Sequence, residues 1–118
     1  MSEVKPVVQK ENTFDPLEIR VGRIISVQPE PAAPKLSYNM LIDFGKFGLK
    51  RSVGRFTKHP PEELLNRLVV AVLNFPVRKI GAVESEVLVL GTQFPRGESG
   101  EATPLSPIAE TRIGGKVF

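Results

Sequence analysis

The chain has 118 residues, 41% of them hydrophobic and 25% charged, a composition typical of one soluble globular domain. It contains no cysteine, which excludes disulfides, thiolate metal sites and thiol nucleophiles and suits a reducing cytoplasm. No apolar stretch approaches the roughly 18 residues of a membrane span, and the N-terminus lacks a secretory signal pattern. We therefore predict a cytoplasmic protein without membrane insertion.

The N-terminal part of the chain changes from a polar tail to a long strand. Residues 1–13 are polar and aperiodic, and we expect a flexible tail. From Leu17 to Val27, apolar and polar residues alternate as in a half-buried strand. Gly22 lies near the point where the alternation changes phase, which indicates a bulge or strong coiling in this first strand.

Four further strand patterns and one helix pattern follow. Alternation predicts a second strand over 38–44 and a third over about 47–56. Proline followed by acidic residues at 61–66 is typical of the first turn of a short helix. Apolar runs at 68–75 and 87–90 predict two buried strands. This order predicts an all-β protein, a five-stranded OB-fold Greek-key barrel with a short helix between strands 3 and 4, plus terminal extensions.

The segment after the fifth strand, residues 92–118, is rich in glycine, proline and serine. Ile108, Ile113 and Val117 are its candidates for short strands or docking segments. We assign residues 14–118 to a single domain that includes this segment.

The net charge of +3 is distributed unevenly along the chain. Residues 44–80 hold eight cations against two glutamates, whereas the rest of the chain is slightly acidic. This asymmetry indicates one basic face able to attract phosphates or acidic peptides. The alternative interpretation is a solvated surface of mixed charge.

Two motifs dominate the sequence. Residues 74–80 read Asn-Phe-Pro-Val-Arg-Lys-Ile, and residues 85–91 read Ser-Glu-Val-Leu-Val-Leu-Gly. Together they resemble the signature of the tRNA-binding-domain family. Residues 14–24 resemble the opening motif of the same family. The Ile-Asp-Phe-Gly sequence at 42–45 resembles the family's branch of export-related chaperones. The chain departs from the family pattern at Val53-Gly54-Arg55, where members usually carry Ser-Gly or Ser-Ala-Gln.

The resemblance implies a dimeric, chaperone-like binding protein for unfolded or export-bound polypeptides. The runner-up is structure-dependent tRNA binding through the same basic face. A synthetase appendage is disfavoured because the chain has its own start and no linker. Since segments outside the barrel build the dimer contact in the family, we expect the apolar positions of residues 92–118, above all 104–118, at a homodimer interface.

The resemblance and the charge pattern together select the candidate residues for binding peptide or tRNA. They are Lys50, Arg55, Asn74, Phe75, Arg78, Lys79, Ser85 and Glu86. Strand alternation separates Lys50 from Arg51 and favours Lys50. Tyr38, Phe47 and Phe56 are further candidates for stacking on bases, although most aromatic residues are expected in the core.

Several of these residues keep a structural alternative. Asn74 either presents its amide to a ligand or caps its own backbone turn. Glu86 either contacts ligand or pairs with Arg78 or Lys79. The sequence shows no phosphate-binding glycine loop, no nucleophile motif and no metal-ligand set, so we predict a protein that is not an enzyme and has no cofactor.

Overall fold

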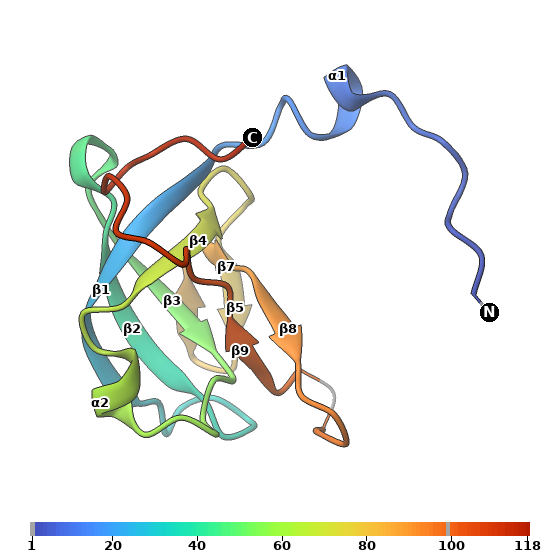
Figure 1. Cartoon of the computed structure of the whole chain (residues 1–118). Helices are drawn as coiled ribbons and strands as arrows, with labels where there is room; N and C mark the ends of the chain where they lie inside the picture. The colour runs from blue at the N-terminus through green and yellow to red at the C-terminus, as the bar shows by residue number, and fades with distance from the viewer. Residues whose placement is uncertain (1, 99) are drawn as a thin grey trace.

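The computed structural model describes residues 2–98 and 100–118, and Figure 1 shows their arrangement. Its α-helices are α1 (Lys10–Thr13) and α2 (Pro61–Leu64), and Gly45–Phe47 forms a 3₁₀ turn. The strands are β1 (Ile19–Pro29), β2 (Tyr38–Asp43), β3 (Leu49–Gly54), β4 (Leu68–Val72), β5 (Arg78–Ile80), β6 (Val83–Ser85), β7 (Leu88–Val89), β8 (Gly91–Gln93) and β9 (Ala102–Pro104).

Five strands form one antiparallel sheet in the order β3-β2-β1-β4-β7, which curls into a nearly closed barrel. The long β1 serves two neighbours, because its first half pairs with β4 and its second half with β2. The predicted OB-fold is therefore confirmed, with α2 between β3 and β4.

The bulge in β1 lies at Ile25, between the pairs Ile24–Ile42 and Ser26–Leu41, and not at Gly22. Gly22 has a different role. A Cβ atom at this position would lie 2.6 Å from both the Ile42 and the Phe44 side chains. The glycine therefore leaves room for two core side chains against the backbone of β1.

The core fills the inside of the barrel. Phe44, Ile24, Met40, Ile42 and Val69 are fully buried. At one end Leu64, the buried residue of α2, closes the barrel. The helix begins with Pro61 and has two glutamates in its first turn, as the sequence predicted.

The segments outside the five-stranded sheet are more ordered than expected. The basic connection after β4 is the β5–β6 hairpin, and the C-terminal segment contains the β8–β9 hairpin. Residues 114–117 then bond to the part of β1 that β2 leaves open: Gly114 N–H donates to Val21 O over 2.7 Å, and Val117 N–H to Ile19 O over 3.2 Å. Residues 2–13 run away from the barrel and include the single helical turn α1 (Figure 1).

Candidate functional site

A cavity of about 440 Å³ lies on one face of the barrel. The loop between β1 and β2, the end of β3, the β5–β6 hairpin and the β8–β9 hairpin surround it. Its principal lining residues are Lys35, Ser52, Val53, Arg55, Phe56, Arg78, Ile80, Leu88, Val89 and Ala102. This volume suits a small ligand or a few side chains of a larger one.

The Phe56 ring packs directly against the backbone of Gly54 and Gly91 and contributes to the apolar floor of the cavity. A Cβ at Gly54 would approach the Phe56 ring to 2.9 Å, and one at Gly91 would approach it to 3.0 Å. The ring itself is only 5% exposed. Phe56 is therefore core rather than an open platform for stacking.

The β5–β6 hairpin and the β1–β2 loop meet at the edge of the cavity. A Cβ at Gly81 would lie 2.3 Å from the backbone oxygen of Ala32, and Gly81 has φ +63°. Glu30 fixes the same loop by accepting hydrogen bonds from the Asn39 side chain (2.8 Å) and from Ala32 N–H (3.1 Å). These bonds, that of Asn39 foremost, hold the pKa of Glu30 below its usual value.

Three cations stand around the apolar floor. The side chains of Lys35 and Arg78 are exposed, and neither side chain makes an ion pair or hydrogen bond within the described part of the chain. Arg55 is held more firmly, because Nη2 pairs with Glu98 Oε2 at 2.9 Å and Nε lies 3.4 Å from Leu36 O. The cavity therefore offers apolar contact inside and positive charge at its rim.

The structure brings only some of the predicted residues together. Arg55 and Arg78 line the main cavity. A smaller cavity of about 60 Å³ adjoins it at Arg78 and is lined by Phe75, Ser85 and Glu86. Lys79 is exposed on β5, outside both cavities.

Ser85 and Glu86 close the barrel. The Ser85 hydroxyl is buried, accepts a bond from Val53 N–H (3.0 Å) and donates to Val87 O (3.2 Å). Glu86 N–H donates to Arg51 O, and a carboxylate oxygen accepts from Arg51 N–H. These bonds join β3 to the segment before β7. In residues 2–98 and 100–118, Glu86 forms no ion pair with Arg78 or Lys79.

Asn74 has a structural role that neither sequence-based alternative named. Its Oδ1 accepts from Glu18 N–H at 2.7 Å, and its Nδ2 donates to Pro16 O at 2.8 Å. It thereby fixes the segment leading into β1. Lys50 is half-buried and lies outside both cavities, while Arg51 is exposed and donates to Asn39 Oδ1.

Sequence reasoning missed Lys35 as a site residue, although it directly follows the last proline of the β1–β2 loop. It also missed the apolar lining from β7 and β9, because strand alternation does not reveal which loops fold over a sheet face. Of the aromatic side chains considered for stacking, Tyr38 is buried like Phe56, and Phe75 is 43% exposed. Phe47 is half-buried under the Arg20 guanidinium, 4.6 Å from its ring centroid.

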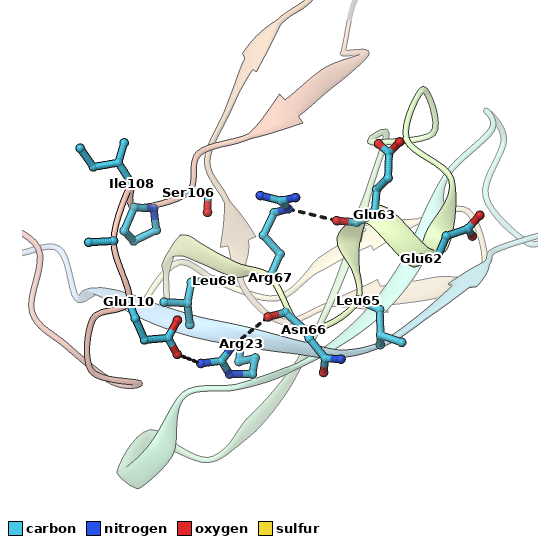
Figure 2. A pocket seen from close by; sticks show the side chains of 12 residues that line it. Arg23, Glu62, Glu63, Leu65, Asn66, Arg67, Leu68, Ser106, Ile108 and Glu110 are labelled. Atoms are coloured by element: carbon cyan, nitrogen blue, oxygen red, sulfur yellow. Dashed lines mark hydrogen bonds and ion pairs between the residues drawn. The ribbon is translucent and has the colours of Figure 1, made fainter.

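A further cavity, of about 430 Å³, lies apart from these two, between the C-terminal residues 106–110 and the corner from α2 to β4 (Figure 2). Arg23 pairs with Glu110 and donates to Asn66 O over 2.7 Å, and Arg67 Nε donates to Glu63 O over 3.0 Å. Ile108 stands at its outer end, fully exposed (Figure 2). The polar groups here largely satisfy one another.

Two searches over the described residues gave negative results. No helix among them has the length and apolar character needed to cross a bilayer. No group of three or more His, Cys, Asp or Glu side chains among them is arranged to hold a metal ion.

Comparison with known proteins identifies the fold family. Residues 19–116 match the family model described as "Putative tRNA binding domain", a module that carries no catalytic site of its own. The crystal structure of chaperone CsaA from Bacillus anthracis is 33% identical, with a TM-score of 0.85 over 96% of this chain and all of that one. The CsaA chaperone protein from Picrophilus torridus gives 34% identity and a TM-score of 0.83, over 94% of this chain and all of that one.

Curated relatives include much longer enzymes. Methionine–tRNA ligase of Pyrococcus horikoshii is 37% identical over 109 residues, which is 92% of this chain but only 14% of that enzyme. The likeness to synthetases is therefore confined to one separate, non-catalytic domain.

Proposed function

Because the chain belongs to the tRNA-binding-domain family, we propose that it is a dimeric, non-catalytic binding protein of the CsaA type, acting on unfolded or export-bound polypeptides in the cytoplasm. The observation that carries this proposal is the cavity with an apolar floor and a cationic rim. Extended, unfolded chains expose apolar side chains beside backbone and acidic groups, and such a surface complements them. The similarity to two structures of CsaA chaperones supports the same conclusion.

The buried position of Phe56 favours polypeptide over RNA in the main cavity. Stacking of bases requires an open aromatic face, and this ring is 5% exposed. The side chains that a ligand can reach inside are mainly aliphatic, such as Ile80 and Leu88. Aliphatic side chains of a client polypeptide would bury apolar area there.

tRNA binding is the second candidate function. Arg78 and Lys79 are exposed, and Arg78 shares the smaller cavity with Phe75, which presents the one well-exposed ring among the aromatic residues considered for stacking. A backbone of phosphates could follow this edge of the barrel, with Phe75 stacking on a base. The family match supports this candidate too.

A titration distinguishes the two candidates. The protein is mixed with bulk tRNA and with an apolar, unfolded test polypeptide, each at about 50 mM and about 200 mM salt. Binding through several phosphates weakens steeply over this range, by orders of magnitude for six or more contacts, whereas apolar capture persists. We expect salt-tolerant binding of the polypeptide and weak binding of tRNA.

The double variant Arg78→Ala, Lys79→Ala is expected to weaken polypeptide binding by about three- to tenfold, because it removes one rim cation of the cavity and its neighbour. The matched control is Lys5→Ala, Lys10→Ala, which removes the same charge from the N-terminal arm. Equal losses in the two double variants would contradict a local role for the β5 cations. Tight, salt-sensitive tRNA binding without polypeptide capture would instead support the second candidate.

The dimer is proposed on the exposed apolar side chains of the C-terminal segment. Ile108 and Phe118 are almost fully exposed, and Leu105 is partly so. A second copy of the chain that covered these side chains would remove their apolar area from water. We expect twice the chain mass in sedimentation equilibrium, and a shift toward the monomer on Ile108→Asp with Phe118→Asp. A monomer at all concentrations would refute the dimer without touching the binding site.

A further inference from the structure

The three rim cations of the main cavity differ in one respect: among the residues that the structure describes, only Arg55 already pairs with a carboxylate. Its side chain is 15% exposed, and Nη2 lies 2.9 Å from Glu98 Oε2. Glu98, by contrast, is 73% exposed. A mostly solvated carboxylate therefore covers a mostly buried guanidinium at the edge of the apolar floor.

Glu98 is carried by the loop between β8 and β9, and the β8–β9 hairpin contacts the β3–α2 loop at three points. Besides Arg55 and Glu98, Lys58 Nζ lies 3.7 Å from Glu101 Oε1. His59 Nε2 also lies 2.9 Å from Thr103 Oγ1. These contacts keep the acidic loop beside the cavity. The position of Glu98 next to Arg55 is therefore supported by the neighbouring contacts and does not depend on its own side chain alone.

The loop backbone comes close to the same guanidinium. Gly100 lines the cavity, and a Cβ at Gly100 would lie 3.5 Å from both Cδ and Nη1 of Arg55. Gly100 has φ +89°, a conformation that glycine tolerates far better than other residues. The backbone at Gly100 therefore lies close to the Arg55 side chain, near the pair of Arg55 with Glu98.

We propose that Glu98 occupies the place of a client carboxylate on Arg55, and that the cavity selects polypeptide segments in which an acidic side chain lies beside apolar ones. This inference rests on the proposed polypeptide-binding function and names the class of segment bound. A guanidinium forms its strongest hydrogen bonds with carboxylates, often through two parallel N–H donors. An aliphatic side chain next to that carboxylate would pack inside the cavity against Ile80, Leu88 and Val89, which line it together with Phe56.

Displacement of Glu98 by a client is physically reasonable. An ion pair whose carboxylate is largely solvated contributes little, because water and salt screen it. A client carboxylate brings the same charge and adds burial of apolar area, so it can replace Glu98. The internal carboxylate then acts as a competitor, which lowers affinity for acidic segments without excluding them.

The test uses two synthetic peptides of the same apolar sequence, one with a central glutamate and one with glutamine in its place. Their affinities are measured by fluorescence anisotropy for the full chain and for Glu98→Gln. We expect the wild-type protein to bind the glutamate peptide more tightly, and Glu98→Gln to raise that preference by a further two- to fivefold. Affinity for the glutamine peptide should stay unchanged.

Glu101→Gln is the matched control, because it removes the same charge from the same loop. Glutamine keeps a side-chain oxygen that can accept the hydrogen bond from Glu98 N–H (3.1 Å), so the pair of Arg55 with Glu98 stays in place. Arg55→Met should remove most of the preference for the glutamate peptide, since Lys35 and Arg78 remain at the rim. Equal responses of Glu98→Gln and Glu101→Gln would mean long-range charge alone and would overturn the inference. Equal binding of both peptides to the wild type would also overturn the inference, but it would leave the proposed polypeptide-binding function intact. Failure of both peptides to bind would overturn the inference and the proposed function together.

Discussion

A Gly22→Val variant is expected to lose about 3 kcal/mol of folding free energy, the upper part of the range for overpacked cores. The Cβ would already lie 2.6 Å from Ile42 and Phe44, and both side chains are fully buried. Two γ-methyl groups make the conflict worse. Since small domains have only about 5–15 kcal/mol in total, this is a large fraction of the stability.

Urea or thermal unfolding followed by circular dichroism measures this loss, which corresponds to roughly 10 °C in Tm for a domain of this size. Gln28→Val is the control, because residue 28 is exposed on the same strand and valine favours strands. A Gly22→Val protein as stable as the control would show that β1 can move away from the core. The close approach inferred for Gly22 would then be wrong.

Gly81→Ala is expected to weaken binding of the apolar test polypeptide at least tenfold, with a loss of stability of only about 1–2 kcal/mol from the left-handed backbone. The new Cβ cannot occupy a position 2.3 Å from the Ala32 oxygen, so the β5–β6 hairpin and the β1–β2 loop must separate. These two segments carry Arg78 and Lys35, which face the same cavity. Their separation widens the rim and removes the convergence of the two cations.

The matched control is Gly48→Ala. Gly48 has φ +90° and ψ −177°, a region open almost only to glycine, yet nothing lies within 4 Å of its Cβ position. This variant therefore carries a backbone cost of similar size without displacing the hairpin. We expect it to bind the polypeptide normally at temperatures where it is folded. Normal binding by Gly81→Ala as well would show that the contact with Ala32 does not shape the site.

Acidic segments as preferred clients would relate the charge pattern of the sequence to a single surface. Residues 44–80 contain most of the excess positive charge. Acidic residues of the same chain neutralise part of this charge, because Glu98 pairs with Arg55 and Glu101 lies near Lys58. Within residues 2–98 and 100–118, the cations without an acidic partner include Lys35 and Arg78 at the rim. Net charge along the sequence is therefore a poor guide to where positive charge is available to a ligand.

The sequence by itself determined the barrel. Alternation in β1 and β2, the apolar run of β4 and the Pro-Glu-Glu start of α2 are local signals, and each reports the burial of its own segment. They fix the number and order of the main elements, and for a chain of this size few folds satisfy that order. The motifs at 74–80 and 85–91 placed it in its family on the same local evidence.

Only the tertiary structure decided what each motif residue does. Ser85, Glu86 and Asn74 read as polar ligand contacts, yet their hydrogen bonds go to backbone groups of β3 and of the segment before β1, distant in the sequence. Lys35 and the β8–β9 hairpin reach the cavity only because the chain folds back over one face of the sheet. Local periodicity carries no information about such long-range contacts. A polar residue has the same appearance in the sequence whether its side chain binds a ligand or hydrogen-bonds another strand.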